Sequence, residues 1–597
     1  MAPASAGSRG APFCPAAVSI DGGGPDTRQP SQASLLTRHF FRRVLDNDLV
    51  SPGEDLHAPL AAILAVLMTV VGGVSAILIL KYNRPTPIPF DERLAMALDD
   101  KVLLLGCAMV VMALVTLLVW DSLSLDRRDV AVLGALPIRS RTLLLSKTAS
   151  LGGLAAALAV ALSVPSAVPF TVVVLAQAPV GVLYALRSMG AQAAAVFLGC
   201  TFVFLALVSL RALACLVLPA SLARRALLAV QCVFIPALFA LLLVLPLLAM
   251  MTRPAIEAGS RAALAWPPLW FLGINDVLVG HDLPMLRELA RLGVVALAAT
   301  AALACATYLL AFRRDLERFK DRPPDGLSRT GGAGATLLRT TIAVLVADPL
   351  ARASCAFTVI TLVRSPRHRL YLVGYLGAGF ALACASVAAS YGRVQPAMLD
   401  LTPIALAVQF NLLFFLLVGV RIAATIPADL QAAWLFRFLA TSALSRHLAG
   451  TRCAVVAFGV VPMLLLLAPV HALLWGWYAA AVHGAWGLGF ALAMWTVLFW
   501  EFDTLPFACA ATPGGSRLTN RLWLYITGYL LAVYAPAHLE RALITRPELA
   551  MAWAALAVSC AATLVVRRPS RVRRDRLPNF EEPSGEVQQL GLGTLLP

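Results

Sequence analysis

Residues 101–121 read KVLLLGCAMVVMALVTLLVWD, and this stretch decides the class of fold. No charged residue lies between Lys101 and Asp121, so the stretch is long enough for an α-helix to cross the hydrocarbon core of a bilayer. Similar blocks recur along the 597 residues, of which 60% are hydrophobic and 13% are charged. Soluble domains have about 25% charged residues. The composition therefore excludes a soluble globular protein and indicates a polytopic membrane protein.

The apolar blocks predict about twelve membrane-spanning helices, six in each half of the chain. The first half has them at 57–80, 101–121, 148–177, 189–217, 226–251 and 287–312, and the second half at 370–390, 402–425, 449–479, 485–509, 521–537 and 547–566. The predicted fold class is all-α. It is a polytopic transmembrane helical bundle of about twelve spans in two tandem six-helix repeats.

Five regions follow from this arrangement. They are a disordered tail at 1–33, a first six-span half at 34–312, a cytoplasmic linker at 313–368, a second six-span half at 369–566 and a cytoplasmic tail at 567–597. Leu36, Phe40 and Val44 are spaced as on one helix face and predict an amphipathic interfacial helix at 34–55, with a plain juxtamembrane linker as the alternative. A second amphipathic helix is predicted along the membrane surface at about 337–363.

The formal net charge of +16 comes from basic residues that gather in alternate loops between the apolar blocks. This is the bias of cytoplasmic loops in membrane proteins, so it favours a bilayer partner over nucleic acid. The bias places both termini in the cytoplasm, and the 252–287 loop, with Arg253, Arg261 and Arg287, fits less well. We expect a multi-pass protein of a plasma membrane, such as the bacterial inner membrane.

The connector after the second span, at 122–147, has a charged patch, a short apolar helix face ended by a proline, and then basic residues. Its candidate docking residues are Asp126, Arg127, Arg128, Asp129, Leu133, Leu136, Pro137, Arg139, Arg141 and Lys147. A short helix of this kind can lie under the membrane and insert into a cleft of another protein. The alternative is an ordinary amphipathic loop that re-enters the bilayer.

A second connector, at 426–452, lies in the matching position of the second half. Ser140-Arg141 aligns with Ser445-Arg446, and Lys147 aligns with Arg452, both at one offset (446 − 141 = 305). Its candidate docking residues are Trp434, Arg437, Phe438, Arg446 and Arg452. The repetition in two halves favours docking of a cytosolic partner over two unrelated loops.

The pattern from Asp126-Arg127-Arg128-Asp129 through Leu136-Pro137 to Lys147 resembles the coupling helix of ABC-2-type ATP-binding cassette transporter permeases. The interfacial helix at 34–55 and the element at 266–272 before the sixth span also have counterparts in that family. The second connector departs from it, with Thr441-Ser442 in place of Leu-Pro. The resemblance implies a permease, an exporter, on which two copies of a cytosolic ATPase dock.

The sequence has no Gly-x-x-x-x-Gly-Lys-Ser/Thr motif that could hold ATP phosphates. We therefore expect no catalytic residues and no cofactor on this chain, and we place ATP and Mg²⁺ on the partner ATPase. The 11 cysteines show no Cys-x-x-Cys spacing and predict no metal site. A membrane-embedded lipid- or glycan-modifying enzyme is the third alternative, and it lacks clustered acid and base residues.

Charged side chains inside apolar blocks are the remaining candidates for function. Arg211 and Arg421 lie near predicted cytoplasmic ends, where the side chain can reach the interface. Glu501 and Asp503 lie within the tenth predicted span, as a structural pair with an arginine or as proton carriers of an ion-coupled secondary transporter. The scattered histidines are expected at the membrane interface, and they are His281, His471, His483 and His538.

Overall fold

The computed structural model describes a chain that is helical wherever it is regular, with no strand among the residues that it describes. Those residues are 31–45, 71–75, 77–78, 81–82, 89–123, 133, 136–175, 181–281, 283–321, 333–391, 402–428, 444–500, 502, 504–508, 522–544, 553, 555 and 558–559. Within these ranges, nine helices are long and apolar enough to cross a membrane. The prediction of an all-α, multi-pass membrane bundle is confirmed.

Each of the nine helices coincides with a predicted span. In the first half they are α3 (Phe90–Leu118), α5 (Ser140–Leu175), α6 (Val182–Val217), α7 (Ala220–Met250) and α11 (Pro284–Asp321). In the second half they are α14 (Pro366–Tyr391), α15 (Pro403–Ala423), the run of α17 (Leu444–Val455), the π-turn η3 (Val456–Val460) and α18 (Val461–Trp475), and α19 (Trp477–Leu498). The span predicted at 521–537 is a helix, α21 (Leu522–Ile544). Those predicted at 57–80 and 547–566 lie mostly outside the described residues.

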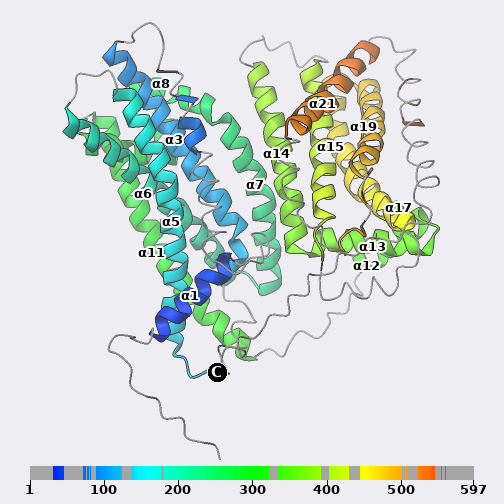
Figure 1. Cartoon of the computed structure of the whole chain (residues 1–597), viewed down its shortest axis with the longest axis horizontal. Helices are drawn as coiled ribbons and strands as arrows, with labels where there is room; N and C mark the ends of the chain where they lie inside the picture. The colour runs from blue at the N-terminus through cyan, green and yellow to red at the C-terminus, as the bar shows by residue number, and fades with distance from the viewer. Residues whose placement is uncertain are drawn as a thin grey trace, which may run out of the picture.

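The helices form two bundles that stand side by side (Figure 1). The first is built around α3, whose central residues pack against α5, α6 and α7, and the second around α15, which packs against α14, α19 and α21. The bundles meet where α7 lies along α14. A methyl group on Gly377 of α14 would come within 3.1 Å of the Pro236 Cα of α7. The two helices therefore touch almost backbone to backbone.

The turn between α18 and α19 is a single residue, Gly476, with φ of +83°. Only glycine adopts this conformation without strain, so it reverses the chain in the shortest possible space. The sequence left residues 480–484 between two predicted spans, but these residues belong to α19. Helix α19 ends at Leu498 rather than near residue 509.

An amphipathic helix, α1 (Gln32–Leu45), crosses the start of α5. Leu36 and Phe40 are buried in a cluster with Leu143 of α5 and Phe312 of α11. The helical part of the interfacial prediction is thus confirmed as far as residue 45, and 46–55 lie outside the described residues. We call the end of the molecule where α5 and α17 begin the connector end.

The linker carries two helices where one was predicted, α12 (Ala333–Leu345) and α13 (Pro349–Arg364). Pro349 lacks the backbone N–H that would continue the helix from α12. Asp348 instead caps α13, where its carboxylate accepts a hydrogen bond from Ala351 N at 3.1 Å. Both helices lie across the connector end (Figure 1), and α13 packs along α17 as α1 packs along α5.

The cap gives a first prediction. Asp348→Ala should destabilise the protein by about 1 kcal/mol, because it leaves an N–H of the first turn of α13 without a partner. Asp348→Asn is the matched control, since asparagine caps helices as well as aspartate does. Thermal unfolding in detergent measures both. Equal losses in the two variants would show that the charge of Asp348, and not its cap, supports α13.

We call the opposite end of the molecule the far end. A short helix, α10 (Pro267–Val279), lies there and comes between α7 and α11 in the sequence. Two prolines begin it, and its 13 residues are too few to cross a bilayer. It packs against α3, α6 and α11. At Gly273 a side chain would lie 2.5 Å from Leu286 O, so α10 and α11 are in close contact.

Candidate functional site

The first connector is partly described, and its exposed part is basic. Leu133 packs on the cluster around Phe40, whereas Leu136 is 51% exposed and Arg139 and Arg141 are exposed. Pro137 is also exposed and lies in the short non-helical stretch before α5 begins at Ser140. The candidates Asp126, Arg127, Arg128 and Asp129 lie outside the described residues.

Lys147 does not lie on this surface, although the sequence placed it among the docking residues. It is 3% exposed, and its Nζ lies 5.0 Å from the centre of the Phe40 ring of α1. Beside it, Ser146 Oγ donates a hydrogen bond to Ala33 O at 3.2 Å. Lys147 therefore fastens α1 to α5 by a cation–π contact.

The second connector is described only at its two ends, so Trp434, Arg437 and Phe438 lie outside the described residues. At its end, Arg446 is exposed and its Nε lies 3.6 Å from Asp348 Oδ2, the capping residue of α13. Arg452 is half-buried one helical turn and a half further along α17. Arg446 thus joins the exposed surface and Arg452 faces partly inward.

The start of the second connector is fastened to the segment that follows α19. Ala428 N donates to Phe507 O at 2.7 Å, and Phe507 N donates to Ala424 O at 2.9 Å. Phe507 has φ of +62°, a strained conformation for an aromatic residue. Its buried ring packs against His368 of α14, whose Nε2 lies 2.9 Å from Ile426 O. The base of this connector is therefore held by α14 and by the segment that follows α19.

Arg211 and Arg421 hold neighbouring helix ends together. The sequence had predicted only that their side chains reach the membrane interface. Arg211 Nη1, on α6, donates to Trp120 O just after α3. In the second half Arg421 Nε, on α15, donates to Leu498 O at 3.0 Å, at the end of α19. A cation at helix C-terminal carbonyls is electrostatically favourable. Arg211 thus links α6 to the end of α3, and Arg421 links α15 to the end of α19, both at the connector end.

Glu501 and Asp503 lie outside the described residues, and α19 ends before both of them. Two groups of buried ionisable side chains lie near the far end, one in each bundle. Neither of these groups was predicted from the sequence.

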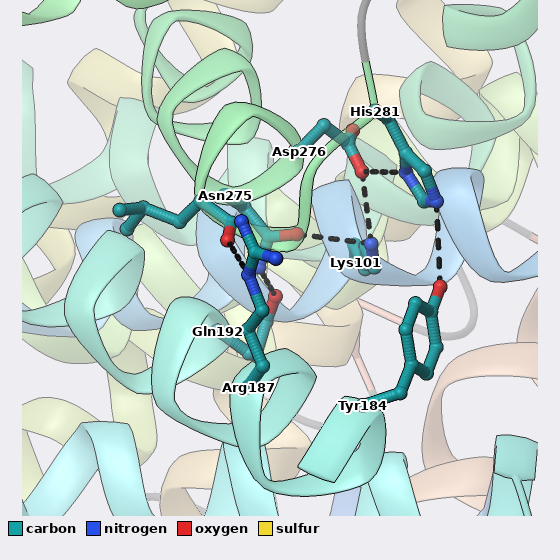
Figure 2. A network of polar contacts seen from close by, with 8 residues as sticks. Lys101, Tyr184, Arg187, Gln192, Asn275, Asp276 and His281 are labelled. Carbon is teal, nitrogen blue, oxygen red and sulfur yellow. Dashed lines mark hydrogen bonds and ion pairs between the residues drawn. The ribbon is translucent and has the colours of Figure 1, made fainter. Parts of the chain in front are cut away.

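The first buried group joins α3, α6 and α10 (Figure 2). Lys101 Nζ donates to Asn275 Oδ1 at 2.9 Å and to Asp276 Oδ1 at 3.1 Å. Asn275 Nδ2 donates to Gln192 Oε1 of α6 at 2.8 Å. All four side chains are buried, so this polar group ties three helices together inside an apolar bundle.

Further side chains at the edge of this group lie toward the far end. His281 Nδ1 lies 3.1 Å from Asp276 Oδ1, and His281 Nε2 lies 3.3 Å from the Tyr184 hydroxyl. Arg187 Nε donates to Leu278 O at 2.6 Å, and its guanidinium lies against Gly280, which ends α10 with φ of +104°. The structure thus continues the group from the buried Lys101 to side chains at the surface.

The charges of this group determine the ionisation of Asp276. Its burial alone would raise the pKa of the carboxyl group. The ion pair with Lys101 and the hydrogen bonds from His281 and Lys101 outweigh burial and hold the pKa of Asp276 below its usual value. Asp276 is therefore a carboxylate at neutral pH, and Lys101 neutralises it.

The second buried group lies in the other bundle and joins α15, α19 and α21. His483 Nδ1 lies 2.9 Å from both carboxylate oxygens of Glu540, and both side chains are 0% exposed. Gln409 Nε2 donates to His483 O at 2.7 Å. The ring of His471, also buried, lies 4.8 Å from that of His483. His471 and His483 lie near helix ends, as the sequence indicated, but both rings are covered by neighbouring helices.

Polar residues near the ends of apolar spans were the one sequence signal for these groups. Lys101 opens the block from which the fold was recognised, and Glu540 follows the apolar part of α21. Their partners lie far away in the sequence and were not predictable. No cluster of three or more metal-binding side chains occurs in the described part of the chain. Comparison with protein-family models, with curated proteins and with solved structures finds no match to this chain.

Proposed function

We propose that the chain is the membrane-spanning permease subunit of an ATP-driven transporter, an exporter, and that a separate cytosolic ATPase docks on its connectors. One observation supports this above the others. Each bundle has, at the connector end, a helix that packs against the start of its third predicted span, α1 on α5 and α13 on α17. Exposed arginines lie beside both contacts, Arg139 and Arg141 in the first and Arg446 in the second.

These helix contacts make this surface suited to receiving force. A docking surface must be rigid if movement of a partner is to move the helices behind it. Phe40 and Lys147 fix the first surface to α5, and Arg211 and Arg421 join α6 to α3 and α15 to α19. We therefore assign the connectors at 122–147 and 426–452 to two ATPase copies, with ATP and Mg²⁺ bound by those subunits.

The proposed orientation has the connector end and both termini in the cytoplasm of a plasma membrane. Exposed arginines gather at the ends of helices there, and they include Arg139, Arg141, Arg224, Arg225, Arg313 and Arg364. This is the distribution that the positive-inside rule expects. We further propose that one chain, with its two six-span halves embedded in the same bilayer, is the working unit.

The test is recovery of an ATPase with the tagged protein from its native host in mild detergent. Arg139→Glu with Arg141→Glu should reduce the recovered ATPase by about tenfold or more, since reversal places like charges against the partner. Arg261→Glu with Arg291→Glu, two exposed arginines toward the far end, is the matched control and should leave recovery unchanged. Equal recovery of the ATPase with both double variants would show that the first connector is not a docking site.

A second candidate, an ion-coupled secondary transporter, is favoured by the buried charges. Ionisable side chains enclosed in a membrane bundle commonly mark proton or ion pathways, and His483 with Glu540 is such a pair. Reconstituted vesicles separate the two functions. Transport driven by a proton gradient in the purified chain, without ATP, would replace the first proposal with the second.

A further inference from the structure

We infer that α12 and α13 present a surface that binds the headgroups of anionic phospholipids in the leaflet at the connector end. We call it the linker surface, and its exposed side chains are Leu337, Arg339, Val344, Ile360, Val363 and Arg364. The inference rests on where these helices lie, on their exposed apolar side chains and on their charge. It requires only that the connector end meets a membrane surface, whichever energy source drives the protein.

The linker surface lies where the chain enters the bilayer. Helix α13 ends at Arg364, and the candidate span of α14 begins at Arg367, three residues further along the chain. Helix α13 also packs along α17, where another candidate span begins at Leu444. Both α14 and α17 begin beside α13 at the connector end (Figure 1). Because both of these helices enter the membrane here, α13 lies at the level of the lipid headgroups.

Helix α12 is held at the same level by its packing on α13. Ile342 of α12 and Val346 just after it are buried in a cluster with Ala351 and Cys355 of α13. At the corner between the two helices, Arg352 Nε donates to Val346 O at 3.2 Å. The two helices therefore form one unit that lies across the connector end.

Apolar side chains are exposed on both helices of the linker surface. Leu337 and Val344 are 68% and 87% exposed, and they lie two turns apart on one face of α12. Ile360 and Val363 are exposed one turn apart on α13. A helix that exposes such side chains beside a bilayer is stabilised when they enter the boundary between headgroups and acyl chains. The linker surface thus has the apolar side chains of a helix pair that lies in a membrane interface.

The charge of this segment complements anionic headgroups. Residues 333–369 include five arginines and one acidic residue, Asp348. Asp348 caps α13 and is paired with Arg446, so its own charge is already balanced. Arg339 and Arg364 are exposed on the linker surface, one on each helix. A cluster of about four or more basic residues beside a transmembrane helix attracts anionic lipids.

A phospholipid fits this mixture of side chains better than a soluble anion does. An arginine can donate two parallel hydrogen bonds to a phosphate group, while its aliphatic stem lies along apolar surface. The acyl chains of a lipid would in addition cover Leu337 and Val344, which a free phosphate would leave in water. We therefore assign the linker surface to the lipid and not to free phosphate.

Retention of lipid by the purified full chain tests the inference. The tagged protein is immobilised in a neutral detergent and incubated with labelled phosphatidylglycerol, which is anionic, or with labelled phosphatidylcholine, which has no net charge. The wild type should retain more phosphatidylglycerol, and added salt should reduce the difference, because salt screens charges at the surface. Equal retention of the two lipids at low salt would overturn the inference. Inorganic phosphate that displaces phosphatidylglycerol better than sodium chloride of the same ionic strength would also overturn it.

A double variant assigns the retention to the linker surface. Arg339→Gln with Arg364→Gln should weaken the binding of phosphatidylglycerol by about tenfold or more and leave phosphatidylcholine unchanged. Arg261→Gln with Arg291→Gln is the matched control, because it removes two exposed arginines toward the far end. Equal losses with the two double variants would show that retention follows the overall charge of the protein, against the inference.

Recovery of the ATPase separates this inference from the proposed function. Arg139→Glu with Arg141→Glu should lower recovery of the ATPase and leave the preference for phosphatidylglycerol intact, since these residues lie outside the linker surface. Suppose instead that Arg339→Gln with Arg364→Gln lowers recovery of the ATPase and retains phosphatidylglycerol as the wild type does. A protein would then cover the linker surface, and the inference would be wrong while the proposed function stands.

Discussion

Lys101→Met should destabilise the protein by about 3–5 kcal/mol, because it leaves the Asp276 carboxylate buried and unpaired. The other side chain that contacts the Asp276 carboxylate is His281, which is half-buried. The variant should also loosen α10 from α3, since Lys101 bonds both Asn275 and Asp276. Unfolding by denaturant in mixed micelles measures the loss.

The double variant Lys101→Met with Asp276→Asn is the control for this prediction. It removes both charges together, so no uncompensated ion remains in the bundle, and it should recover much of the lost stability. A single variant that loses less than about 1 kcal/mol would show that water or another group reaches Asp276. A double variant that is worse than the single one would show that the amide cannot be accommodated at position 276.

Gly450→Ala should cost about 3 kcal/mol and separate α13 from α17. An added Cβ would collide with Ala351 O and lie 2.8 Å from the Ser354 Cβ, so the backbones of the two helices must move apart. Gly152→Ala in α5 is the matched control, because nothing lies within 4 Å of its Cβ position. Alanine there should stabilise the helix by up to about 1 kcal/mol.

Cys355 reports this separation chemically. Burial against α17 raises the pKa of the Cys355 thiol to about 12, with a smaller contribution from Cys453. The reactive thiolate is therefore nearly absent at neutral pH, and maleimide should not modify Cys355 in the wild type. The Gly450→Ala variant should expose it to water and make it react. Continued protection of Cys355 in that variant would show that α13 remains docked despite the collision.

The sequence predicted the described spans because their signal is local. A block such as 101–121 must be helical in a bilayer whatever its neighbours are, since every backbone group needs a partner within the segment. The predicted boundaries of the helices were less accurate, because a single residue can end a helix. Gly476 reverses the chain earlier than the hydropathy pattern indicates, and Pro349 divides the linker helix in two.

The buried polar groups could not be predicted, for the opposite reason. Lys101 and Asp276 are brought together by the packing of α10 against α3, and nothing in either local sequence specifies the other partner. His483 and Glu540 each look like an interfacial residue near the end of an apolar span. The distinction between an interfacial side chain and a buried pair depends on which helices cover it, and that is a property of tertiary structure.

The contact between α7 and α14 bears on the order in which the protein is made. Helix α7 is anchored to the first bundle by α3, and both precede α14 in the chain. Because domains fold in sequence as they are synthesised, α14 enters the membrane beside a surface that is already in place. The close approach of Pro236 and Gly377 then fixes the position of the first helix of the second bundle. The position of α14 therefore depends on α7, and so on the bundle that comes first in the chain.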